Sequence, residues 1–245
     1  MKIQRSFPAF TVTKKAEKAL KEGHPWVYDT EITAGEDCEN GALADIFSQK
    51  GSYLGTGFLS LNSKIRIRRL SDNANETFGP EFFARRVKYA IDYRRTVMRD
   101  DFGACRLIFG EADGLPGLTA DRYGGIISAQ VLSYGMELRK DIVYRAICDE
   151  LAADGVKVTG IMERNDAAIR KLEGLNEYKG WYTADHLPSP PSPVTEITEN
   201  GIIYSVDTEN GQKTGFFLDQ KYNRLAVMKL AKGMKVLDCF THTGS

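Results

Sequence analysis

The chain has 245 residues, of which 42% are hydrophobic and 27% charged, so it is long enough for two domains and able to bury a core. Its 33 basic and 33 acidic residues give a formal net charge of +0, so any nucleic-acid binding would depend on local basic patches. Its four cysteines form no CxxC pair, so we expect no metal site and no disulfide framework, and we place the protein in the cytoplasm. The sequence shows no signal peptide and no apolar run of roughly 20 residues, so we expect no membrane partner.

The first segment, residues 1–72, is predicted to be a small β-barrel-like module. Residues Lys14–Glu22 have the apolar spacing of a short amphipathic helix, which Gly23 ends. Strands are predicted at Ala42–Phe47, Tyr53–Leu59 and Lys64–Leu70, separated by Gly and Asn/Ser turns. Short strands at such close spacing favour a compact β-module.

Basic and apolar residues alternate in the last of these strands. The alternation would place Lys64, Arg66 and Arg68 on one face of the strand, where three cations suit a phosphate backbone. An edge strand guarded by charge gives the same pattern, and on this stretch alone it is the favoured interpretation.

The middle segment, residues 73–186, is predicted to be a small α+β domain. Its predicted elements, in chain order, are a helix at Pro80–Asp100, strands at Cys105–Phe109, Leu118–Asp121 and Ile126–Val131, a helix at Glu137–Ala153, a strand at Val158–Met162 and a short helix at Asp166–Leu172. The acidic run between Glu111 and Asp121 could suggest acid–base catalysis, but its Asp-Gly and Pro-Gly dipeptides favour a tight connection between strands.

The last segment, residues 187–245, begins in a proline-rich linker, since four of the eight prolines lie between His186 and Pro193. A hairpin is predicted for Val194–Asp207 around Asn200-Gly201. A helix capped by Asp219 should follow and extend to Ala231, and Met234–Phe240 is predicted to be a buried strand that enters a small-residue turn.

Two nucleotide-binding motifs can be tested against this segment. GQKTG lacks the spacing of a P-loop, and Asp238–Gly244 supplies only one glycine of a GxGxxG turn. An Asp-x-Phe-x-x-x-Gly turn after a buried strand instead matches the first motif of class I methyltransferases. By spacing alone, an ordinary strand and turn remains open.

Four stretches in order, GHPWVY, DGLPGLTADRYG, GQKTGFFLDQKYNR and VLDCFTHTG, resemble the PUA-domain rRNA cytosine-5 methyltransferases. The resemblance covers the whole chain. It implies a multidomain protein of α/β and α+β class. Residues 1–72 would form an N-terminal PUA-like β-barrel, residues 73–186 a central α+β domain, and residues 187–245 the linker, hairpin and start of a Rossmann-like methyltransferase domain.

The resemblance also implies a cofactor, a partner and site residues. The cofactor would be S-adenosylmethionine, and the partner ribosomal RNA of the large subunit; a homodimer is left open. The implied cofactor-binding residues are Gln212, Thr214, Phe216, Phe217, Asp238, Phe240, Thr243 and Gly244, and the implied RNA-binding residues are Lys64, Arg66 and Arg68. Cys239 is interpreted as a packing residue rather than a nucleophile.

The sequence departs from the family in one respect. The family's catalytic cysteine and later cofactor motifs follow the first motif, and no residue of this sequence follows Ser245. We therefore expect a truncated chain that contains the RNA-binding part and the GQKTGFFLDQ segment that leads into the cofactor site. Such a chain should be inactive alone and should bind S-adenosylmethionine weakly. The alternatives are a stand-alone RNA-binding module, or an RNA methyltransferase acting on another base such as guanine N2.

Overall fold

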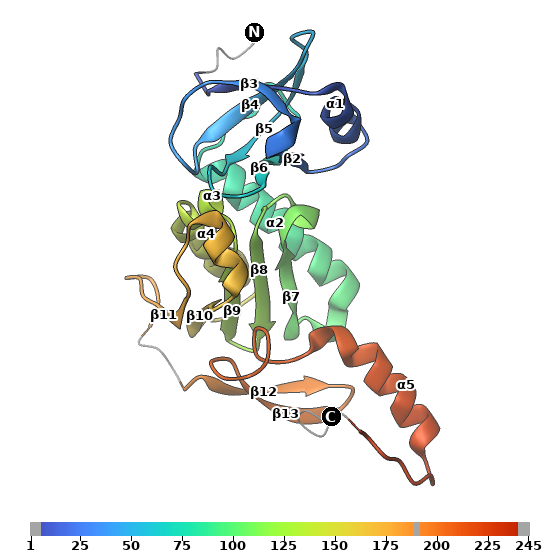
Figure 1. Cartoon of the computed structure of the whole chain (residues 1–245). Coiled ribbons are helices and arrows are strands. Elements are labelled where there is room, and N and C mark those ends of the chain that lie inside the picture. Colours follow the sequence, from blue (N-terminus) through green and yellow to red (C-terminus); the bar gives the residue numbers. More distant parts are fainter. Residues whose placement is uncertain (1–5, 189–191, 240–245) are drawn as a thin grey trace.

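The computed structural model describes residues 6–188 and 192–239, which are arranged around three sheets (Figure 1). The first sheet has six strands in the order β2-β6-β5-β4-β1-β3. The second has five strands in the order β11-β10-β9-β8-β7, and the third is the hairpin β12-β13. The first sheet lies at one end of the molecule and the hairpin at the other, with the five-stranded sheet between them.

The first sheet and one short helix form the N-terminal unit. Its elements are β1 (Ala9–Val12), α1 (Lys14–Lys21), β2 (Trp26–Tyr28), β3 (Ile32–Gly35), β4 (Leu43–Ser48), β5 (Tyr53–Leu59) and β6 (Ile65–Ser71). Leu20 of α1 packs against Val12, Val27 and Ile67 in a fully apolar core. The predicted helix and the three predicted longer strands are confirmed. The three additional strands have only three or four residues each, too few to show a period.

The central unit combines the five-stranded sheet with two long helices. Its elements are α2 (Pro80–Met98), β7 (Ala104–Phe109), β8 (Leu118–Tyr123), β9 (Ile126–Val131), α3 (Tyr134–Glu137), α4 (Lys140–Ala153), β10 (Gly160–Asn165), a 3-10 helix at Ala168–Glu173 and β11 (Tyr178–Tyr182). Strands β9 and β10 are parallel and joined through α4, whereas the other neighbours are antiparallel.

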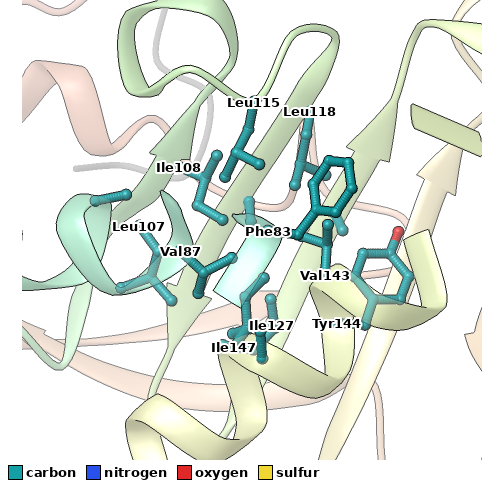
Figure 2. Packing of buried hydrophobic residues seen from close by; sticks show 14 of the residues in the cluster. Phe83, Val87, Leu107, Ile108, Leu115, Leu118, Ile127, Val143, Tyr144 and Ile147 are labelled. Atoms are coloured by element: carbon teal, nitrogen blue, oxygen red, sulfur yellow. The ribbon is translucent and has the colours of Figure 1, made fainter. Parts of the chain in front are cut away.

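Helices α2 and α4 cover one face of this sheet. Val87 of α2 and Ile147 of α4 meet Leu107 and Ile127 of the strands in the largest apolar cluster (Figure 2). The structure corrects the predicted single helix at Glu137–Ala153, because the chain turns at Leu138 and Arg139 between α3 and α4. It also adds β11, which was not predicted.

The last segment contains β12 (Val194–Glu199), β13 (Ile202–Asp207) and α5 (Lys221–Ala231). Asn200 and Gly201 both have positive φ, at 52° and 79°, as the predicted type I′ turn requires. The predicted cap is wrong, since Asp219 lies in a 3-10 turn and Gln220 occupies the cap position without a side-chain bond.

The predicted buried strand is wrong for residues 234–239. This stretch is not a strand, and Leu237 is 85% exposed. A strand needs a neighbour to satisfy its backbone groups, and within the described residues none pairs with this stretch. Cys239 is exposed too, so it is not a packing residue here.

Candidate functional site

The loop that carries GQKTG is docked on the open face of the central sheet, through Tyr123 of β8. The Tyr123 hydroxyl accepts the N–H of Phe216 at 3.1 Å and donates to its carbonyl at 3.2 Å. Its oxygen also lies 3.1 Å from Oγ1 of Thr214. Burial raises the pKa of the Tyr123 phenol far above its ordinary value, so the group stays a neutral donor.

An ion pair beside Tyr123, between buried Asp121 and partly exposed Arg106, holds the same loop. Asp121 accepts two bonds from the Arg106 guanidinium, at 2.8 and 3.0 Å, and a bond of 2.5 Å from the Thr214 hydroxyl. The bond with Asp121 raises the pKa of Arg106. Because Asp121 is almost completely buried, the charge-assisted bond to Thr214 fixes the loop strongly.

Two further contacts set the path of the loop. Arg164 of β10 donates to the carbonyls of Gly211 and Thr208 at 2.9 and 3.2 Å. The loop backbone folds tightly on itself, because a Cβ on Gly211 would lie 2.3 Å from the Gly215 carbonyl oxygen. Phe216 then inserts its ring beside Tyr123 in a small apolar cluster with the hairpin.

The predicted cofactor residues of this loop take different positions. Thr214 and Phe216 are buried in the docking contacts just described. Gln212 is exposed, whereas Phe217 is half-buried with the Lys213 ammonium 4.4 Å from its ring centre. Thr214 and Phe216 therefore position the loop, and of these two Phe216 also lines a cavity of about 230 Å³ next to Arg106 and Lys213.

Asp238 lies on the wall of a separate cavity of about 620 Å³ between the hairpin and α5. Apolar side chains of Ile202, Val227 and Leu237 form much of that wall. None of the four predicted residues from the GQKTG loop lines it, so the structure does not bring the two predicted halves of the cofactor site together. Phe240, Thr243 and Gly244 lie outside the described residues. The described residues therefore do not form a complete S-adenosylmethionine pocket.

The predicted RNA-binding residues differ in how free their charges are. Lys64 is exposed. Arg66 is half-buried and donates to the Ser60 carbonyl at 2.9 Å. The Arg68 side chain is only 12% exposed and pairs with Glu111 and Glu173 of the central unit, both at 3.0 Å. The charge of Arg68 is thus neutralised between two units, while that of Lys64 is available.

The same interface uses Trp26, whose Nε1 donates to Glu111 at 2.8 Å. In the turn that follows β7, Asp113 takes two bonds from Arg94, at 2.6 and 2.7 Å. Glu111 and Asp113 are therefore structural ion-pair partners, and the interpretation of this run as a tight connection is confirmed.

Cys105, which is buried, and Cys148, which is half-buried, offer no activated thiol. Burial raises the pKa of Cys105 to about 12 and that of Cys148 to about 11. Over residues 6–188 and 192–239, no group of three or more His, Cys, Asp or Glu side chains is placed to hold a metal ion. In the same ranges, no helix is long and apolar enough to cross a membrane.

Sequence reasoning missed the residues that hold the loop, namely Asp121, Tyr123 and Arg164. A signal for two of them was present, since Asp121 and Tyr123 are two residues apart in a strand and therefore share a face. Their partners, 93 positions away along the chain, could not be found from local spacing.

Comparison with known proteins identifies the N-terminal unit. Residues 10–72 match the family model of the PUA-like domain. The first sheet is a PUA-like domain.

The chain is also homologous to several curated proteins named "Ribosomal RNA large subunit methyltransferase I". It is 39% identical to the one from Photobacterium profundum over 238 residues, 38% identical to the one from Aeromonas salmonicida over 235 residues and 36% identical to one from Klebsiella pneumoniae over 240 residues. These matches cover 95–97% of this chain but only 57–58% of the relatives, so the chain spans less than two thirds of their length.

Two solved structures share the fold. One is a candidate SAM-dependent methyltransferase from Streptococcus mutans, and the other is a candidate methyltransferase complexed with SAH. Both align with a TM-score of 0.71 and 22% identity, over 90% of this chain and 53–54% of theirs. The likeness supports the mixed α/β architecture.

Proposed function

We propose that this chain is the RNA-binding and cofactor lead-in part of an S-adenosylmethionine-dependent methyltransferase that acts on ribosomal RNA of the large subunit in the cytoplasm. The observation that carries the proposal is the identity of 36–39%, along nearly all of the chain, to proteins named for that activity. The PUA-like match at residues 10–72 supports RNA as the partner.

In this proposal the three units have separate roles. The PUA-like domain contacts RNA phosphates through Lys64 and Arg66, with Arg68 holding the domain in place against the central unit. The central sheet positions the GQKTG loop, from which Gln212 and Phe217 are available to the cofactor while Thr214 and Phe216 anchor the backbone.

The cofactor we propose is S-adenosylmethionine, which supplies an electrophilic methyl group when bound. The residues that would hold it are Asp238 with Phe240, Thr243 and Gly244, following the first methyltransferase motif. A solved fold relative complexed with SAH, the product of methyl transfer, supports this cofactor. The described residues alone do not close this pocket.

The base we propose is cytosine, methylated at C5. That carbon is a poor nucleophile and needs a thiolate added at C6. Cys105 and Cys148 do not suit this role, because burial holds both thiols protonated at neutral pH. A methyltransferase acting on guanine N2, and a stand-alone RNA-binding module, are the alternatives that the following assay separates.

The test is to incubate the complete protein with labelled S-adenosylmethionine and large-subunit rRNA, and to digest the RNA to nucleosides. We expect label in 5-methylcytidine. Label in a guanosine derivative would replace the base assignment. No labelled nucleoside, together with salt-sensitive RNA binding, would leave only the RNA-binding module.

A further inference from the structure

Three large aromatic side chains are exposed on one surface of the central unit. Tyr89 is 57%, Tyr93 59% and Phe109 54% exposed, although each neighbours the largest apolar core. Buried positions beside them on α2 and β7, such as Val87 and Ile108, point inward to that core (Figure 2). The aromatic residues therefore lie on the outer side of elements whose inner side is fully used.

The three residues are linked through a shared helix face and a shared ion pair. Tyr89 and Tyr93 are one turn apart on α2 and so share a helix face. Arg94 lies 5.1 Å from the Tyr93 ring and pairs with Asp113, whose carboxylate also accepts the backbone N–H of Phe109. Tyr93 and Phe109 thus border the same ion pair, and together with Tyr89 they form what we call the aromatic stripe.

The stripe has cations along it. The Arg106 guanidinium lies 5.2 Å from the Phe109 ring. Beyond Tyr89, a polar cavity of about 440 Å³ at the junction with the PUA-like domain is lined by Arg69 and Arg86. In the described residues neither of these two arginines pairs with a carboxylate, and Nε of Arg86 is buried without a hydrogen-bond partner. Three carboxylates line the same cavity. Glu111 and Asp113 are already paired with Arg68 and Arg94, and Asp72 offsets part of the positive charge of the two arginines.

The stripe connects the two ends of the proposed site. One end is the junction cavity beside the PUA-like domain. At the other end, Arg106 lines a cavity of about 230 Å³ together with Lys213 of the GQKTG loop and Tyr222, whose ring is also exposed. An extended strand lying on the stripe would therefore run from the RNA-binding domain to the loop.

We propose that Tyr89, Tyr93 and Phe109 form a stacking surface for the bases of single-stranded RNA that leads from the PUA-like domain to the GQKTG loop. Exposed aromatic rings interleaved with arginines bind single strands, because every base has a face that can stack. A duplex would not bind in this way, since its bases are already stacked. This inference names the form of the RNA and rests on the proposed function.

The test is fluorescence anisotropy of the 245-residue chain with labelled single-stranded RNA of about 12 nucleotides. Leu in place of Tyr89, Tyr93 or Phe109 keeps apolar area but removes the aromatic face. We expect each Leu variant to bind about tenfold more weakly, with an unchanged dependence on salt because no phosphate contact is lost. Tyr89→Phe and Tyr93→Phe should bind like the wild type.

Leu172→Ala is the matched control, since Leu172 is 61% exposed on the 3-10 helix after β10 and should have no effect on binding. Leu variants that bind RNA like the wild type would overturn the inference. A wild-type chain that binds duplex RNA more tightly than single-stranded RNA would also overturn it. The same holds if the Leu variants lose self-association of the chain but still bind RNA normally. If the complete protein methylates rRNA while the Leu variants bind single-stranded RNA normally, only this inference fails. If the Leu variants bind RNA more weakly but the complete protein does not methylate rRNA, only the proposed function fails.

Discussion

The Tyr123 hydroxyl is bonded to both backbone polar groups of Phe216, accepting its N–H at 3.1 Å and donating to its carbonyl at 3.2 Å. One buried side chain of the central sheet thus bonds to two successive peptide groups of the loop that carries GQKTG. The Phe216 carbonyl also accepts the N–H of Leu218 at 3.1 Å, whereas the Phe216 N–H depends on the Tyr123 hydroxyl. Satisfying this buried N–H helps an irregular loop to hold one conformation against a sheet.

Removing this hydroxyl should loosen the loop. Tyr123→Phe keeps the ring but leaves the N–H of Phe216 unsatisfied, while the Phe216 carbonyl keeps its bond from the N–H of Leu218. The free energy of unfolding should therefore fall by about 1–3 kcal/mol. Urea denaturation measures the loss, and limited proteolysis should cut sooner near residues 207–220. The matched control is Tyr222→Phe, at an exposed position, which should change stability by less than about 0.5 kcal/mol. Equal stability of the two variants would show that the hydroxyl does not anchor the loop.

The bond between Thr214 and Asp121 should matter comparably. Thr214→Val removes the donor from a buried carboxylate and should lower the free energy of unfolding by about 1.5–3 kcal/mol, since a charged acceptor is involved. Thr214→Ser keeps the hydroxyl and should cost less than half of that loss. If thermal denaturation finds the Val variant more stable than the Ser variant, the methyl group of Thr214 contributes more to stability than its hydroxyl, and the prediction is wrong.

The basic residues in and just before β6 should separate into structural and RNA-binding roles. Arg68→Gln leaves Glu173 buried without its cation and should lower the free energy of unfolding by about 3 kcal/mol. Lys64→Gln should leave stability unchanged and reduce the salt dependence of RNA binding by about one phosphate contact. Chemical denaturation and binding titrations over a range of salt concentrations test both. A stable Arg68→Gln protein with a reduced salt slope would reverse the assignment.

Alkaline pH should weaken the Tyr123 anchor. Its pKa is raised in the folded protein, whereas an unfolded tyrosine loses its proton near pH 10. The contribution of the phenol is therefore fully present below about pH 10 and is lost as the pH rises above it. The stability advantage of the wild type over Tyr123→Phe should shrink by about 1 kcal/mol between about pH 10 and pH 11. A constant difference over this range, measured by urea denaturation, would mean that the phenol is not held neutral.

Local patterns in the sequence predicted much of the fold. The Asn200-Gly201 turn and the long helix α2 follow from short-range rules of φ and helical period, and the structure confirms both. Strands of three or four residues such as β2 were missed, because their stability comes from pairing with β6 and not from their own composition.

The site was less predictable, for a physical reason. Thr214 and Phe216 were predicted to bind the cofactor, and the structure buries them in contacts with Asp121 and Tyr123 of β8, which are set by tertiary structure. Arg68 looks like a free cation in the sequence, since the alternation of β6 says nothing about Glu111 and Glu173 of another unit. The predicted strand at Met234–Phe240 did not form in its described part, because backbone pairing requires a neighbour.

The measurement that tests the central claim most directly is methyl transfer by the complete protein. Large-subunit rRNA and S-adenosylmethionine carrying a labelled methyl group are incubated with it, and the nucleosides are separated after digestion. We expect labelled 5-methylcytidine that depends on the protein and on the cofactor. Recovery of all the label in unreacted cofactor, with RNA bound but unmodified, would contradict it.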